Sequence, residues 1–240
     1  MSLDAKPSKS TGFTMTELLV AMSVVAVISI VIATSMALLS DTYRIATNEA
    51  KLLQKKVALS DFLKRHVMQA GSVHPQSLLG EITAPVELSF SNTTGGSNLT
   101  LIYDENGSSR VKYNLTMLGC TSSTSCSSND TNFIQLTKWA WVNSAWQQQG
   151  ESEPLALDVD AFQVVVENSN GLATSAFPSL TSLFDNDVAL ISLDILLRSS
   201  KALKQKAKVS RYELYRTSLS FEDRYVREHL RLNIAPRVSL

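Results

Sequence analysis

Residues that commonly build active sites are scarce in this sequence of 240 residues. It contains two cysteines and three histidines, and the histidines, His66, His74 and His229, are scattered along the chain. None of them stands in a metalloprotease HExxH motif, and no GxSxG, CxxC or phosphate-binding P-loop sequence occurs. We therefore expect no catalytic residues, no metal site and no cofactor, and the sequence does not predict an enzyme.

The sequence also lacks an excess of charge of either sign. Its 22 lysines and arginines are balanced by 22 aspartates and glutamates. Proteins that bind nucleic acids obtain much of their affinity from positive charge placed against phosphates. No nucleic-acid partner is expected, and the one basic run, Lys201 to Arg211, is interpreted as a solvated loop or strand connection.

Charged residues, glycine and proline are all absent from Leu18 to Leu39, a run of 22 residues. As a helix this run would span about 33 Å, which matches a bilayer core of about 30 Å. A secretory signal has a shorter apolar region, and a core helix of a soluble domain would have a polar face. We interpret the run as a membrane-embedded helix, and Lys6 and Lys9 before it place the N-terminus in the cytoplasm and the rest of the chain outside.

A single carboxylate, Glu17, stands at the entrance to this helix. Ionised side chains are strongly disfavoured in hydrocarbon, so an acidic residue there indicates a site with a specific partner. Upstream, Gly12 precedes Phe13, and a residue without a side chain lets the backbone approach a peptidase closely. The arrangement consists of Gly12-Phe13-Thr14, Glu17 four residues beyond Phe13, a short basic leader before them and an apolar run after them. It resembles the class III signal of type IV pilins and type II secretion pseudopilins.

This resemblance implies the roles of three residues. A prepilin peptidase would cut between Gly12 and Phe13 and methylate the new amino group of Phe13. Glu17 would neutralise the N-terminal amine of a neighbouring subunit during filament assembly, which agrees with the rule that a buried carboxylate is tolerated when a cation meets it. The alternative is a plain membrane anchor with a chance glutamate at the level of the lipid headgroups.

Further features narrow the resemblance to minor pilins of the PilW type and J-type pseudopilins. Major pilins usually carry a proline that kinks the helix, and Ile30 to Leu38 has none. Ser60 to Gly71, Asp187 to Ser200 and Arg227 to Val238 have counterparts in these families. The resemblance implies a minor pilin that primes or caps a type IV pilus; a J-type pseudopilin and a membrane-tethered adhesin or other binding module remain alternatives.

The resemblance also implies partners and a location. The partners would be other minor and major pilins, reached through the N-terminal helix, the prepilin peptidase and the inner-membrane assembly platform. The chain would cross the inner membrane once with a periplasmic head, and would then move to the pilus and the cell surface.

Beyond the membrane run the helical pattern continues. A stripe of apolar residues recurs at spacings of three, four or seven, at Ile45, Leu52, Leu59, Leu63 and Val67. Gly71 suits the position after a helix end, and Pro75 prevents resumption. We predict one helix from Phe13 to about Ala70, and divide the chain into a cleaved leader (1–12), a transmembrane or filament-core helix (13–40), its amphipathic continuation (41–71) and a β-rich head (72–240).

The head is predicted to be antiparallel β-sheet packed on the helix, which gives an α+β, pilin-like fold. Asn106-Gly107 between two β-rich runs predicts a tight hairpin. Runs rich in β-forming residues are Val86–Phe90, Asn98–Glu105, Arg110–Met117, Phe133–Val142, Ala161–Asn168, Val188–Leu197 and Tyr212–Phe221, with a C-terminal strand near Arg227–Val238.

Two further groups in the head carry expectations. Cys120 and Cys126 are separated by five small polar residues, and in an exported head they are predicted to form a disulfide. Trp139, Trp141 and Trp146 lie close in the sequence; Trp139 and Trp141 share a strand face and are interpreted as packing inside the head, with a contact surface as the alternative.

Overall fold

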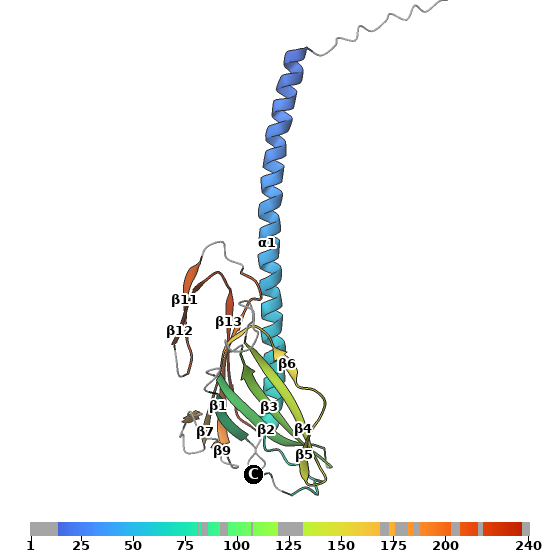
Figure 1. The fold of residues 1–240 in the computed structure, drawn as a ribbon, viewed down its shortest axis with the longest axis vertical. Helices are drawn as coiled ribbons and strands as arrows, with labels where there is room; N and C mark the ends of the chain where they lie inside the picture. The colour runs from blue at the N-terminus through green and yellow to red at the C-terminus, as the bar shows by residue number, and fades with distance from the viewer. Residues whose placement is uncertain are drawn as a thin grey trace, which may run out of the picture. The chain divides into compact units, whose positions relative to one another are not determined.

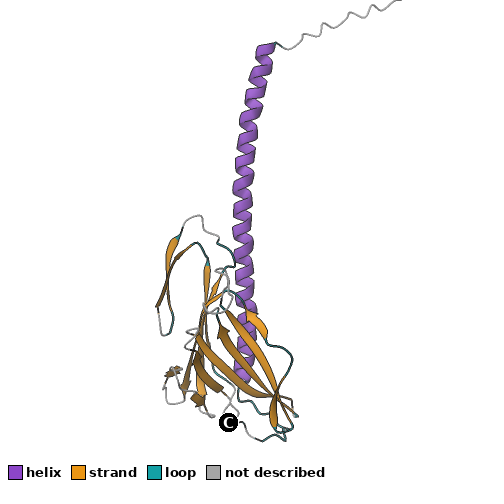
Figure 2. Ribbon diagram, in the orientation of Figure 1, coloured by secondary structure: helices purple, strands orange, loops and turns teal. Residues whose placement is uncertain are grey.

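A computed structural model describes residues 14–80, 82, 86–91, 96–106, 108–119, 132–168, 173–175, 182–184, 188–202, 207–215 and 218–236. In these residues one helix is followed by thirteen strands (Figures 1 and 2). Contacts within the chain define two units, Met1–Thr47 and Asn48–Leu240. The predicted α+β class, a long N-terminal helix and an antiparallel β-sheet head, is confirmed.

Helix α1 spans Met15–Gln69, 55 residues, which corresponds to about 82 Å. The predicted first residue, Phe13, lies outside the described residues, and the observed end is within one residue of the predicted one. Gly71 follows the helix with a φ of 78°, the left-handed conformation that glycine adopts without strain. Its N–H donates to the carbonyl of Ile102 at 2.8 Å, so the chain leaves the helix directly against the sheet.

The larger sheet has seven strands in the described residues, all paired antiparallel. Its order is β5-β4-β3-β2-β1-β9, and β6 pairs with β4. The strands are β1 Val86–Ser91, β2 Gly96–Asn106, β3 Ser109–Leu118, β4 Phe133–Val142, β5 Ala145–Gln148, β6 Glu153–Ala156 and β9 Ser182–Phe184. The predicted β2–β3 hairpin is confirmed, since Asn106 pairs with Ser109.

This sheet has an inner face toward the core and an outer face. Along β3 the buried side chains are Val111, Tyr113, Leu115 and Met117, while the alternating Lys112, Asn114 and Thr116 are only half-buried. Period-two alternation places these two sets on opposite faces. The terms inner face and outer face are used below for these two sides of the larger sheet.

The second sheet has four strands in the order β13-β10-β7-β8, namely β7 Val159–Asn168, β8 Ala173–Ser175, β10 Val188–Arg198 and β13 Arg227–Ile234. A separate hairpin consists of β11 Lys208–Glu213 and β12 Ser218–Asp223. Every residue of β10 from Ile191 to Leu197 is buried. One face of β10 enters the main core, and Leu196 on the other face packs with Ala161 and Leu214, beside Tyr212, Leu219 and Phe221 of the hairpin.

The main core lies between the helix and the inner surfaces of both sheets. The predicted helix stripe supplies Leu52, Leu59, Leu63 and Val67, all buried, while Ile45 is half-buried. They join one hydrophobic cluster with side chains of β1, β2, β3, β4, β7, β10 and β13. Burial of this stripe explains why the helix from Asn48 onward belongs to the head unit.

Three interpretations of the head are corrected by the structure. The run Tyr212–Phe221 belongs to two separate strands, because Leu214 and Tyr215 are not in a strand. The basic run from Lys201 contains the start of β11 at Lys208 and is therefore partly strand. The tryptophans lie on the outer face and are half-buried, so the interpretation of Trp139 and Trp141 as core residues is wrong.

Candidate functional site

The start of α1 is closed by hydrogen bonds between Thr14 and Glu17. The backbone N–H and the hydroxyl of Thr14 each donate to Glu17 Oε2 at 2.9 Å. The backbone N–H of Glu17 donates in return to Thr14 Oγ1 at 3.4 Å. Threonine just before a helix with glutamate three residues later is the capping box, which satisfies N–H groups that have no partner inside the helix.

The capping box gives Glu17 a local role that was not predicted from the sequence. The signal was present, since Thr14-Met15-Thr16-Glu17 has the spacing of Ser or Thr followed three residues later by Glu. Both hydrogen bonds from Thr14 end on Oε2, and in the part of the chain that the structure describes Oε1 accepts none. One carboxylate oxygen therefore holds the helix start, and the other is available to a second donor. The predicted processing residues Gly12 and Phe13 lie outside the described residues.

The helix surface that follows Glu17 is apolar and fully accessible. Leu18 is 56% exposed and Leu38 is 65% exposed, and no residue of α1 before Leu52 is buried. By length and composition α1 is able to cross a membrane. Exposure of such an apolar surface to water is unfavourable, so we expect lipid or another apolar surface to cover it.

Three hydroxyl groups in this stretch donate to carbonyls of the helix itself. Ser23, Ser29 and Thr34 donate to the carbonyls of Val20, Val25 and Ile30 at 2.7, 2.8 and 3.0 Å. Bonding to a carbonyl three or four residues earlier removes the need for an external partner. Polar atoms in hydrocarbon must be satisfied internally, so these side chains are compatible with an apolar environment.

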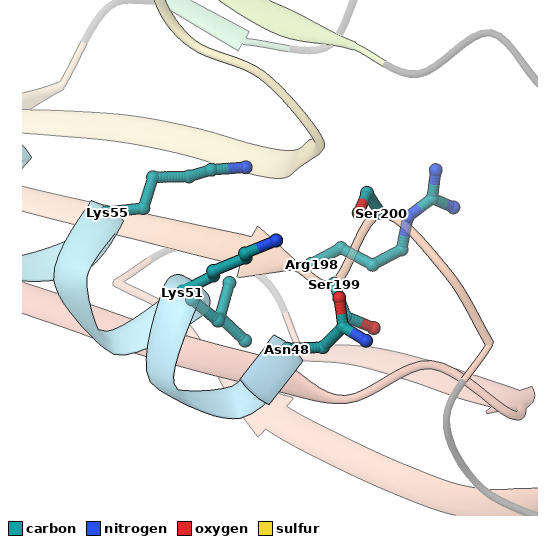
Figure 3. A pocket seen from close by; sticks show the side chains of 7 residues that line it. Asn48, Lys51, Lys55, Arg198, Ser199 and Ser200 are labelled. Atoms are coloured by element: carbon teal, nitrogen blue, oxygen red, sulfur yellow. The ribbon is translucent and has the colours of Figure 1, made fainter. Parts of the chain in front are cut away.

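The second candidate is a small hollow in the head, lined by Asn48, Lys51, Leu52 and Lys55 of α1 and by Arg198, Ser199 and Ser200 (Figure 3). Three cationic residues border it, but two of them are already engaged. Lys55 Nζ donates to Asp158 Oδ2 and to the Leu157 carbonyl, both at 3.2 Å. The Arg198 guanidinium turns away from the two lysines and lies 4.5 Å from the ring centroid of Tyr225. The hollow thus lies beside a polar contact between the helix and the head, formed by Lys55 and Asp158.

A third group, His66 with Tyr103 and Tyr113, lies between α1 and the inner face. His66 Nδ1 and the Tyr103 hydroxyl are 2.6 Å apart, and the ring centroids of His66 and Tyr113 are 4.6 Å apart. Burial, followed by the positive charges of Arg65 and Lys138, lowers the pKa of His66, and the charge of Glu105 opposes this shift. Burial raises the pKa of Tyr103 strongly. Both groups are therefore neutral near pH 7 and act as packing and hydrogen-bonding residues.

A fourth group centres on Asp194, whose side chain is fully buried on β10 beneath the hairpin. It accepts hydrogen bonds from Arg231 Nε at 2.8 Å and from the backbone N–H of Tyr215 at 2.7 Å, and His229 Nε2 lies 3.0 Å away. The hydrogen bond of Asp194 raises the pKa of Arg231. This carboxylate is the polar anchor of the segment that connects β11 to β12.

The described residues contain no group of three or more His, Cys, Asp or Glu side chains placed to hold a metal ion. Cys120 and Cys126, the predicted disulfide, lie outside the described residues. The described residues therefore form an apolar helix with a capped start and a β-sheet head in which the polar groups around His66 and Asp194 are hydrogen-bonded to one another.

Comparison with known proteins identifies the motif and the fold. Residues 7–33 match the prokaryotic N-terminal methylation motif. Among solved structures, a type IV-like pilin from Thermus thermophilus is similar with a TM-score of 0.53 and 11% sequence identity, over 77% of this chain and 95% of that chain. No curated protein matches the sequence. The chain thus combines an N-terminal methylation motif with a type IV pilin-like fold.

Proposed function

We propose that this chain is a structural subunit of a type IV pilus, a minor pilin of the PilW type that primes or caps the filament. The observation that carries the proposal is the methylation motif at residues 7–33, which leads without interruption into the exposed apolar surface of α1. The helix needs an apolar environment, which both a bilayer and the core of a filament provide. This suits a subunit that moves from the bilayer to the filament.

Processing is the first step of the proposed function. A prepilin peptidase cuts after Gly12 and methylates the amino group of Phe13, so residues 1–12 are a leader that is absent from the mature chain. Before the cut the chain spans the inner membrane once, with its head in the periplasm. The peptidase and the inner-membrane assembly platform are then its first partners.

Assembly is the second step. The amine of Phe13 in one subunit pairs with Glu17 of its neighbour, and other minor and major pilins pack against the apolar surface from Leu18 to Leu39. Glu17 Oε1, which accepts no hydrogen bond from the described residues, supports this role, because the carboxylate can keep its cap and accept a second donor. A carboxylate left alone among apolar helices would cost several kcal/mol, and a contacting cation removes most of that cost.

Mass spectrometry of surface filaments tests the proposal. Filaments sheared from the native host are expected to contain this chain at low abundance, beginning at a methylated Phe13. A chain that stays in the membrane fraction with Met1 intact would contradict it. Deletion of the gene distinguishes a type IV pilus subunit from a type II secretion pseudopilin. Loss of surface pili is expected, whereas loss of type II secretion with normal pili would assign the chain to the J-type pseudopilins.

A further inference from the structure

The three tryptophans of the chain form one cluster on the outer face of the larger sheet, where β3, β4 and β5 lie side by side (Figure 1). Trp139 pairs with Lys112 on β3 and with Gln148 on β5, and Trp141 pairs with Trp146. Directly paired residues share a face, and Trp139 and Trp141 are two residues apart on one strand. All three indoles are half-buried, and none belongs to a hydrophobic core cluster.

The cluster is held in place before any ligand arrives. The Trp141 and Trp146 rings meet edge to face with centroids 5.2 Å apart. Lys112 Nζ lies 5.1 Å from the Trp139 ring centroid and 4.9 Å from that of Trp146, so one ammonium contacts two rings. The β4–β5 turn is tight, with Asn143 and Ser144 at φ values of 52° and 63°. Rigid aromatic side chains lose little entropy when they bind.

The surroundings of the cluster are polar and rich in amides and hydroxyls. The outer face continues from it through four side chains with hydroxyl or amide groups, since Asn114 pairs with Thr137 and Thr116 pairs with Gln135. Three exposed glutamines, Gln147, Gln148 and Gln149, follow the cluster on and after β5. The side chains paired with Trp139 are Lys112 and Gln148, and neither is acidic.

We propose that this cluster binds a carboxylate-bearing polysaccharide. Sugar C–H groups carry partial positive charge and stack on the electron-rich faces of indoles, while amides and hydroxyls pair with sugar hydroxyls. Lys112, fixed among the rings, supplies the charge that a sugar carboxylate would meet. A protein interface is less compatible with these observations, because the centre of such an interface is depleted of lysine and the adjoining strip is polar.

Binding can be followed on the full-length chain by its own fluorescence, because every tryptophan of the sequence lies in the cluster. The protein is kept in a zwitterionic detergent without sugar headgroups and titrated with polygalacturonate or with neutral dextran of similar length. A saturable change in tryptophan emission is expected with polygalacturonate, with dextran at least tenfold weaker. Absence of a saturable change with polygalacturonate would overturn the proposal.

Variants then locate the site by retention on immobilised polygalacturonate. Trp146→Ala and Lys112→Gln are each expected to weaken binding at least tenfold. If Trp146→Ala does not fold, the loss of binding in Lys112→Gln tests the proposal alone. The matched control Lys208→Gln removes one exposed positive charge from β11 and should bind like the wild type. Equal weakening in Lys208→Gln would mean that binding depends on overall charge and would overturn the proposal. The proposal would also be overturned if the chain does not respond to the polysaccharide but self-associates, and Trp146→Ala abolishes this self-association.

Discussion

At the scale of single residues, Glu17 combines two roles in one side chain. From the sequence, Glu17 was interpreted as the partner of an amine, with a chance glutamate of a plain membrane anchor as the alternative, because an acidic residue at the entrance to an apolar helix is costly without a cation. The structure adds the capping box with Thr14, which is a sufficient local reason for an acidic residue at this position. The two roles differ in what they require: a cap needs an oxygen acceptor, whereas an amine partner needs negative charge.

His66 gives a residue-scale prediction about pH. Burial, together with the nearby charges of Arg65 and Lys138, lowers its pKa, and Glu105 opposes this. The unfolded chain therefore binds a proton more readily than the folded one, so the stability from neutral His66 is present above about pH 6.5 and is lost as pH falls below it. Lowering the pH from 7.5 to 5.0 should reduce the thermal midpoint of the wild type, and should reduce that of His66→Gln by less.

The measurement is a thermal unfolding series of both proteins at the two pH values. Asp104 and Asp223, whose pKa values are lowered and whose hydrogen bonds to Arg110 and Arg227 contribute to that lowering, lose their stabilising effect only as pH falls below about 3.8, so they do not contribute in this window. An equal pH dependence in both proteins would show that His66 is not the group responsible.

At the scale of elements, the strongly periodic segments were the predictable ones. The helix stripe was predictable because burial requires apolar side chains at its positions, and four of the five are buried. Strand β4 was predicted with its observed bounds, Phe133–Val142. The break between β11 and β12 was missed because no Gly, Pro, Asn or Asp, the usual signals for the end of a strand, occurs from Tyr212 to Phe221. Trp139 and Trp141 were assigned to the wrong face because alternation groups residues on a face without saying which face is inside.

Leu63 gives the element-scale prediction. Its side chain is fully buried between α1 and the head, whereas Leu53 on the same helix is 54% exposed. Leu63→Ala should lower the free energy of unfolding of the head by about 2–5 kcal/mol, because it removes buried methyl groups and leaves a cavity. Leu53→Ala changes the helix propensity identically and should have an effect below about 1 kcal/mol. Urea unfolding of both variants checks this, and similar losses would mean that the stripe does not form the helix–head contact.

At the scale of the whole molecule, the chain combines two units with different requirements. The N-terminal unit exposes apolar side chains that need lipid or another helix, and the second unit has its own core and closed polar clusters. The proposed roles are divided in the same way: the helix would anchor the chain and pack against other pilins, and the head would present surfaces such as the tryptophan cluster. The class of fold was predictable from the apolar run and the β-rich composition, and the capping box from the spacing of Thr14 and Glu17. The position of the tryptophans on the outer face required coordinates.

The central claim is that Glu17 joins this chain to like helices through its charge, and its most direct test compares two variants in sheared filaments. Glu17→Gln keeps the acceptor that Thr14 needs and removes the charge, whereas Thr14→Ala keeps the charge and removes a cap of about 1 kcal/mol. With processing at Phe13 verified by mass spectrometry in each strain, we predict that Glu17→Gln lowers the amount in filaments at least tenfold and Thr14→Ala less than twofold. Normal incorporation of Glu17→Gln, or an equal loss with Thr14→Ala, would contradict the account and leave Glu17 as a helix cap alone.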